Sequence, residues 1–98
     1  MIRLGRAAER HVTELLRHYA RLGRSEAGDN LLAALDLAAS RIEQNPAGGL
    51  PAPRPYPALA RPGIAWVKAG SYWFAYGTTP PLMIIGVFYD KAGIPGRF

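Results

Sequence analysis

The chain has no cysteine, almost no acidic residues in its second half and no long apolar run. Without cysteine, a disulfide-stapled scaffold, a thiol nucleophile, an iron–sulfur cluster and a cysteine-ligated zinc site are excluded. The absence also fits a reducing compartment. The longest apolar run, Pro80 to Tyr89, is about half of what a membrane-spanning helix needs. The first residues lead directly into a charged helical segment, so we expect no secretory signal, no membrane insertion and a cytoplasmic protein.

The length and composition are those of a single small globular domain. The chain has 98 residues, of which 49% are hydrophobic and 19% are charged. Such a composition is typical of folded proteins, and a chain of this length buries about two-thirds of its unfolded surface. We therefore expect one domain over residues 1–98.

The positive charge is concentrated in the second half of the chain. The formal net charge is +5; residues 1–50 carry seven arginines and six acids, whereas residues 51–98 carry a single acid, Asp90. The basic residues of that second half are Arg54, Arg61, Lys68, Lys91 and Arg97. A field of this sign attracts an anionic partner, either nucleic acid or an acidic protein segment. A solvated surface explains the same pattern.

The first half predicts a helical hairpin over about residues 7–45. Apolar residues recur at helical spacing before Gly23, which suits a helix end because glycine adopts the left-handed conformation without steric cost. Ser25 is placed to cap a second helix, and Asn45-Pro46 ends it. Helices joined by so short a connection fold back on each other as an antiparallel pair.

The stretch from residue 46 to 63 is rich in proline, with six of the nine prolines of the chain. Proline fixes φ and lacks an N–H, so this stretch is neither a helix nor a central strand. We expect an extended segment that covers one edge of the core, with Tyr56 and Leu59 as its anchors.

Residues 64–89 predict a three-stranded meander, and a short strand near residues 2–4 is expected to pair at its edge. The predicted fold is thus α+β: an N-terminal helical hairpin packed on a small C-terminal antiparallel sheet, in the order βααβββ. In the middle strand, Tyr72, Phe74 and Tyr76 share one face, whereas Trp73 and Ala75 share the other. Apolar residues on both faces indicate a strand covered on both sides. Because the helices cover only one face, we expect a partner to cover the other.

Four segments in this order resemble the RelE/ParE superfamily of bacterial toxins, and the resemblance spans nearly the whole chain. They are Arg61-Pro62-Gly63-Ile64, Gly70-Ser71-Tyr72-Trp73-Phe74-Ala75-Tyr76, Ile84-Ile85-Gly86-Val87-Phe88-Tyr89 and Ile94-Pro95-Gly96-Arg97-Phe98. The two long helices look more like the ParE branch than the RelE branch.

The chain departs from the polar signature of that superfamily. ParE-like chains have arginines where this chain has Ala65, Gly77 and Gly86, and a histidine where it has Tyr89. An Arg-Asp pair is replaced by Ala92-Gly93.

The resemblance implies the toxin of a type II toxin–antitoxin system, of the kind linked to plasmid stabilization, which inhibits growth. Its partner would be a small acidic antitoxin in a hetero-oligomer. A ParE-like toxin acts on DNA gyrase by binding, without being an enzyme. For that case the residues expected to contact a partner or target are Arg54, Lys68, Trp73, Lys91 and Arg97.

Two alternatives stay open. A RelE-like toxin is an endoribonuclease that cleaves ribosome-bound mRNA; its phosphate transition state needs fixed cations and a group that moves a proton. Tyr89 would move the proton, while Lys68, Arg61 and Arg97 would supply the charge. The missing arginines favour the other alternative, a degenerate, non-toxic module that still binds an antitoxin.

Cofactor and metal chemistry find little support in the sequence. His11, Glu14 and His18 lie at helical spacing, but they lack a fourth ligand and are interpreted as a solvated helix face. A glycine-rich phosphate loop is also missing. We therefore expect no cofactor and no metal site.

Overall fold

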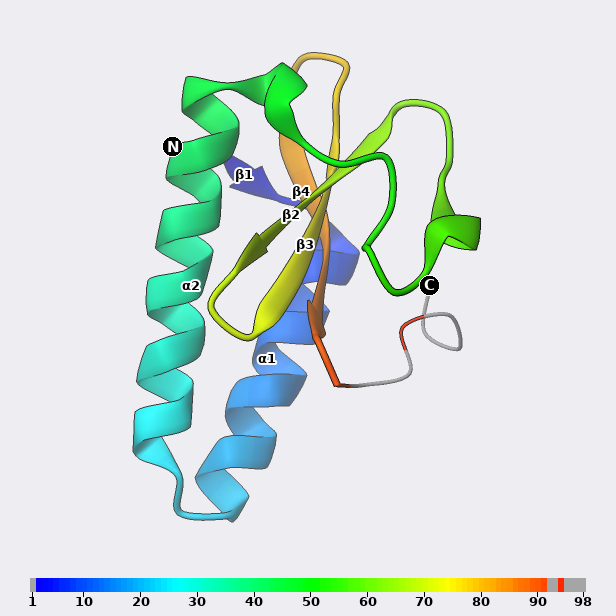
Figure 1. Ribbon diagram of the computed structural model, residues 1–98. Helices are drawn as coiled ribbons and strands as arrows, with labels where there is room; N and C mark the ends of the chain where they lie inside the picture. Colours follow the sequence, from blue (N-terminus) through cyan, green and yellow to red (C-terminus); the bar gives the residue numbers. More distant parts are fainter. Residues whose placement is uncertain (1, 92–93, 95–98) are drawn as a thin grey trace.

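The computed structural model describes residues 2–91 and residue 94 (Figure 1). The helices and strands are β1 (Arg3–Leu4), α1 (Arg6–Arg21), α2 (Ser25–Gln44), β2 (Ile64–Ala69), β3 (Tyr72–Gly77) and β4 (Met83–Tyr89), with short 3-10 turns at Pro46–Gly48 and Pro57–Leu59. The predicted α+β class and the order βααβββ are confirmed.

The four strands form one sheet in the order β1-β4-β3-β2. Strands β2, β3 and β4 are antiparallel neighbours, as the meander predicts. The first strand lies at the edge beside β4, where Arg3 pairs with Met83 and Leu4 with Ile84. This pairing is parallel, so the sheet as a whole is mixed, while its three C-terminal strands are antiparallel as predicted. Parallel pairing is possible because the whole hairpin and two strands lie between β1 and β4 along the chain, leaving room for the crossover.

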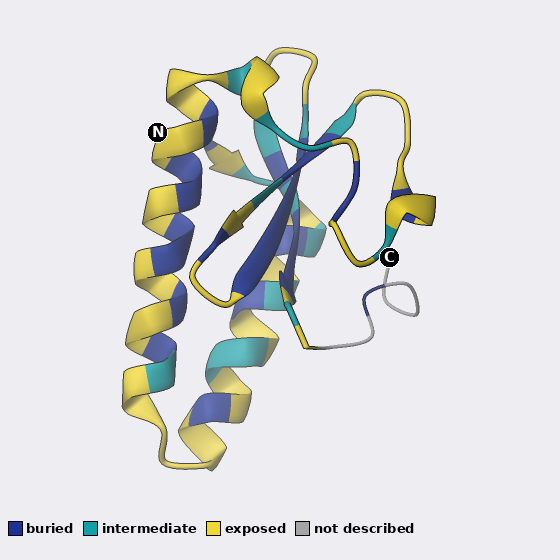
Figure 2. Cartoon of the chain, viewed as in Figure 1, coloured by how far each residue is buried: buried dark blue, intermediate teal, exposed yellow. Residues whose placement is uncertain are grey.

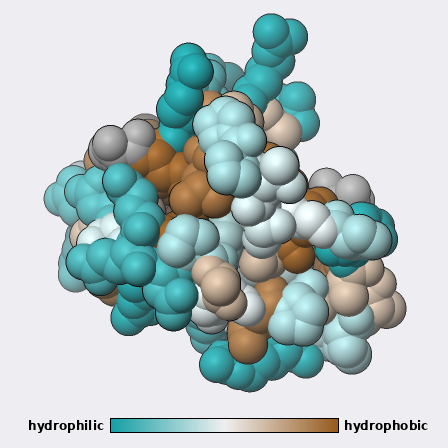
Figure 3. Space-filling model, turned by 90° about the horizontal axis from the view of Figure 1, so that it is seen from above, coloured by the Kyte–Doolittle hydropathy of each residue, from teal (hydrophilic) through white to brown (hydrophobic). Residues whose placement is uncertain are grey.

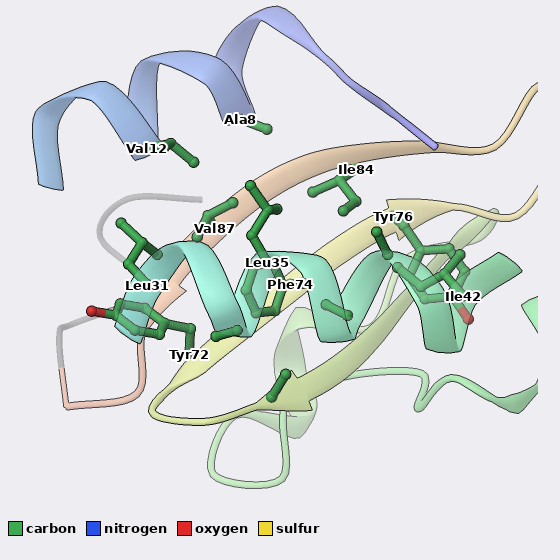
Figure 4. Close-up of a cluster of buried hydrophobic side chains, with 14 of the residues drawn as sticks. Ala8, Val12, Leu31, Leu35, Ile42, Tyr72, Phe74, Tyr76, Ile84 and Val87 are labelled. Carbon is green, nitrogen blue, oxygen red and sulfur yellow. The ribbon is translucent and has the colours of Figure 1, made fainter. Parts of the chain in front are cut away.

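The helical hairpin covers one face of the sheet (Figure 1). Gly23, with φ of 66°, follows the end of α1 and lets the chain turn back into α2. Buried residues follow the side of α2 that faces the sheet, while its other side is exposed (Figure 2). They meet Tyr72, Phe74 and Tyr76 of β3 in the cluster drawn in Figure 4. We call it the helix-face core; it supplies most of the apolar burial that holds the hairpin in place.

The opposite face of the sheet is covered by the chain itself. A second cluster of buried residues contains Ala52, Leu59, Trp66, Trp73, Ala75, Phe88 and Ile94. We call it the reverse-face core. The expectation that a partner covers this face is therefore wrong. The proline-rich segment covers the face because its prolines keep it extended and remove N–H groups that would otherwise need partners.

Backbone hydrogen bonds hold this segment against β2. The N–H of Leu50 donates to the carbonyl of Trp66, and the N–H of Trp66 donates back to Leu50, both at 2.7 Å. Leu59 is buried and Tyr56 packs half-buried on the same core, so both predicted anchors contact the interior, although they cover a face rather than an edge. In the part of the chain that the structure describes, no helix is long and apolar enough to cross a membrane.

Candidate functional site

Three of the residues expected to bind a partner lie together on the reverse face. The Trp73 ring is 2% exposed, and two cations lie near it. The guanidinium carbon of Arg54 lies 5.8 Å from the ring centroid, and Lys68 Nζ lies 5.9 Å from it. An aromatic face attracts cations at this range. Arg54, Lys68 and Trp73 thus form a basic patch on this face.

Part of the charge of this patch is neutralised. Lys68 Nζ lies 3.2 Å from a carboxylate oxygen of Asp90, the one acid in the second half of the chain. Asp90 is fixed in turn by its N–H, which donates to the carbonyl of Ser71. The pairing is not visible in the sequence, because the register of β2, β3 and β4 brings the two residues together.

The structure does not gather the residues expected for RNA cleavage. Lys68 pairs with Trp73, and Trp73 pairs with Phe88. Tyr89 is next to Phe88 along β4, so its side chain points to the opposite face of the sheet. Arg61 and Lys91 are exposed outside the strands. Arg97 lies outside the described residues. The phosphate transition state of RNA cleavage therefore could not contact Tyr89 and Lys68 at the same time.

A cleft of about 580 Å³ lies between α1, the start of α2 and the ends of β3 and β4. Its lining includes three tyrosines, two histidines, one arginine and two glutamates: Tyr19, Tyr72, Tyr89, His11, His18, Arg24, Glu14 and Glu26. A concave surface with aromatic walls and a few polar groups is typical of a binding site. This cleft is therefore the second candidate site, on the helix side of the sheet.

Two tyrosine hydroxyls form the inner wall of the cleft. The hydroxyl oxygens of Tyr19 and Tyr72 lie 2.5 Å apart, and both side chains are buried. The ring of Tyr89 packs beside that of Tyr72, with 5.8 Å between the two ring centroids. Burial raises the pKa of the Tyr72 hydroxyl above its usual range, and the hydrogen bond to Tyr19 raises it further. Burial also raises the pKa of Tyr76, against the effect of a backbone hydrogen bond from Gly49.

These pKa shifts predict that the protein loses stability in alkali. A phenol whose pKa is raised by folding stabilises the fold fully below its unfolded pKa of about 10, and this contribution is lost as the pH rises further. We expect the urea midpoint to fall between about pH 9 and pH 11, and Tyr72→Phe to reduce the fall. Tyr56→Phe, outside the cleft, is the control and should leave the fall unchanged. An equal fall in the Tyr72→Phe protein would contradict the prediction.

His11, which also lines the cleft, is held against β4. The N–H of Val87 donates to Nδ1 of His11 at 3.2 Å, and the His11 ring lies 4.9 Å from the ring of Phe88. The accepting Nδ1 carries no proton, so the ring proton of the neutral imidazole is on Nε2. His11 is half-buried, whereas Glu14 and His18 are exposed. The interpretation of all three as a solvated face is thus wrong for His11. Its side chain fixes α1 to β4 at Val87, beyond the residues of β4 that pair with β1.

The tyrosine pair was not found from the sequence. Tyr19 belongs to the apolar stripe of the first helix and Tyr72 to the helix-side face of the middle strand, which are the signals that could have placed them together.

The resemblance to the RelE/ParE superfamily rests on the four segments quoted above and on the order of the elements. No protein-family model matches the chain, and no curated protein shows a significant match to it.

Proposed function

We propose that the chain is the toxin of a type II toxin–antitoxin system, ParE-like, which inhibits growth by binding DNA gyrase and is neutralised by a small acidic antitoxin. The observation that carries the proposal is the order βααβββ, with the first strand at the edge of the meander and the hairpin on one face. This is the fold that the resemblance implies. Fold alone does not determine function, so the proposal also uses the placement of the charged residues.

That placement favours binding over RNA cleavage. Cleavage needs fixed cations and a proton-transfer group around one phosphate. Tyr89 and Lys68 point to opposite faces of the sheet, and Lys68 is paired with Asp90. The basic patch around Trp73 supports contact with an anionic surface. Binding of this kind does not require the cations and a proton-transfer group to meet at one phosphate.

The antitoxin is proposed to dock in the cleft beside α1. The reverse face is occupied by the chain's own core. The end of the molecule that is seen from above shows hydrophobic residues only in separate areas among hydrophilic ones (Figure 3). The cleft instead offers aromatic walls, with Tyr89 36% exposed at its rim, and the guanidinium of Arg24. An apolar side chain of the antitoxin fits the aromatic walls, and one of its acids can pair with Arg24, whereas Glu14 and Glu26 of the lining repel acids elsewhere in the cleft.

Expression in bacteria with and without the neighbouring gene tests the function. We expect growth arrest with filamentation when the chain is expressed alone, and rescue by the neighbour. Purified protein should inhibit gyrase supercoiling and leave in vitro translation unchanged. A fall in translation, with cleavage inside ribosome-bound codons, would favour the RelE-like endoribonuclease. No effect in either assay would favour the non-toxic antitoxin-binding module.

A pair of variants tests the docking site separately. Tyr89→Ala should weaken co-purification with the antitoxin, because it removes an exposed aromatic ring at the cleft. Leu37→Ala is the matched control, since Leu37 is an exposed apolar residue (44%) of α2 outside the cleft lining. Equal retention of the antitoxin by both variants would place the docking surface elsewhere.

A further inference from the structure

The charges of the first half are divided between the two helices. Residues 1–24 carry six arginines and two glutamates, whereas residues 25–50 carry four acids and one arginine. Summed over both helices, these charges nearly cancel, which conceals the division. Helix α1 itself carries four arginines and two glutamates and is basic, whereas its neighbour α2 carries four acids and one arginine and is acidic.

Four arginines of α1 form one line along its outer side. Arg6, Arg10, Arg17 and Arg21 are four, seven and four residues apart. At 100° per residue they lie within about 60° of each other and extend over about 22 Å. All four are exposed, on the side of α1 opposite its buried residues. We call these four residues the arginine stripe.

The guanidinium groups of the stripe are available to a ligand. Arg10 makes a long contact of 3.9 Å with Glu14, and both side chains are more than 60% exposed. An exposed pair of this kind contributes little. Within residues 2–91, no carboxylate forms an ion pair with Arg6, Arg17 or Arg21.

We infer that the arginine stripe binds the sugar-phosphate backbone of duplex DNA, without reading its sequence. Arginine presents a planar fork of donors that matches a phosphate. A row of four such groups on one helix can follow a phosphodiester backbone, and contacts to phosphates alone carry no sequence information. The inference does not depend on the proposed toxin function.

The composition of the stripe favours nucleic acid over a protein partner. Stable protein interfaces contain an apolar centre with aromatic anchors. Between and beside the arginines lie Thr13, Ala20 and Glu14, none of which is a large apolar anchor. The large exposed apolar side chains of the described chain, Leu22, Leu32, Leu37 and Tyr89, lie off the stripe. Interfaces with DNA are instead polar and strongly positive. The acidic residues of α2 repel the same ligand, which keeps it away from the neighbouring helix.

Binding should therefore depend steeply on salt. Each neutralised phosphate contributes about −0.9 to the slope of log K against log salt, so four contacts give about −3.6. Between 50 and 200 mM salt the affinity should fall by roughly 150-fold.

The test measures fluorescence anisotropy of a labelled duplex of mixed sequence with the full chain. Arg6→Gln/Arg17→Gln/Arg21→Gln removes three stripe charges and keeps a good helix former at each position. Arg41→Gln/Arg61→Gln/Lys91→Gln is the matched control, because it lowers the net charge by the same three units at residues outside the arginine stripe and the basic patch. We expect the stripe variant to lose at least tenfold in affinity and its salt slope to fall to about −1, with the control near wild type. Circular dichroism of both variants verifies that they are folded.

Three outcomes would overturn the inference. Equal losses in the two variants would mean that only net charge matters. A poly-glutamate peptide that binds more tightly than the duplex through the same arginines would identify an acidic protein segment as the ligand. A stripe variant that binds DNA normally but has a smaller apparent mass would identify the stripe as a contact between copies of the chain.

Discussion

Gly86→Arg is expected to unfold most of the protein, whereas Gly77→Arg should change the free energy of unfolding by less than about 1 kcal/mol. A Cβ at position 86 would lie 2.6 Å from Cε2 of Phe88 and 2.9 Å from its Cζ. The rest of an arginine side chain would enter the reverse-face core, where an unpaired charge costs several kcal/mol (about 4 or more with the clash). At Gly77 no heavy atom lies within 4 Å of an added Cβ.

Urea unfolding followed by circular dichroism measures this difference. Gly86→Ala separates the steric effect from the charge: the Phe88 ring must move to admit a methyl group, at a cost of about 1–3 kcal/mol. A Gly86→Arg protein as stable as wild type would mean that Phe88 does not pack over position 86 and that this face is not a closed core.

This comparison bears on the departures from the ParE-like pattern. Two of the positions where that pattern has arginine, Ala65 and Gly86, are buried here in the helix-face and reverse-face cores. Gly77 is half-exposed. A chain that covers its own sheet on both sides has no space for a charged side chain at positions 65 and 86.

Trp66→Ala should destabilise the protein by about 3–5 kcal/mol, as much as Phe74→Ala. Trp66 and Phe74 are both 0% exposed, one in each core. Each substitution removes a large ring and leaves a cavity that the surroundings cannot fill. Such a loss is a large part of the total stability of a small domain, which is typically about 5–15 kcal/mol.

Thermal and urea unfolding of both variants check this result, with the exposed Leu37→Ala as the control at about 0.5 kcal/mol or less. If Trp66→Ala behaves like this control while Phe74→Ala does not, the proline-rich segment does not close the reverse face in solution.

The regular elements could be predicted because their signals are local. Gly23 and Asn45-Pro46 mark the helix ends, and the alternation from Tyr72 to Tyr76 indicates burial on both faces of β3. The proline-rich segment was predicted to pack on the core through Tyr56 and Leu59, but its coverage of the reverse face was not predicted. Ala52 and Leu59 belong to a segment without periodicity, and periodicity is what reveals a buried face in a sequence.

The candidate sites were less predictable, because they depend on register and on long-range contacts. Trp73 and Lys68 are neighbours only through the pairing of β2 with β3, and Tyr19 meets Tyr72 only when α1 lies across the sheet. The arginines of α1 were visible, but counting charge over residues 1–50 concealed them. Counting along each predicted helix separately would have found them.

The hydrogen bonds between Leu50 and Trp66 have a consequence for how molecules of this protein meet one another. Together with the guanidinium of Arg41, which donates to the carbonyl of Lys68 at 2.8 Å, they occupy outward-pointing groups of β2. An outermost strand with vacant groups invites a foreign strand to continue the ladder, which is a common start of aggregation. Here a strand of another molecule must first displace the protein's own backbone from the edge of β2. Growth of the sheet into a fibre from this edge is therefore opposed, even in concentrated solution.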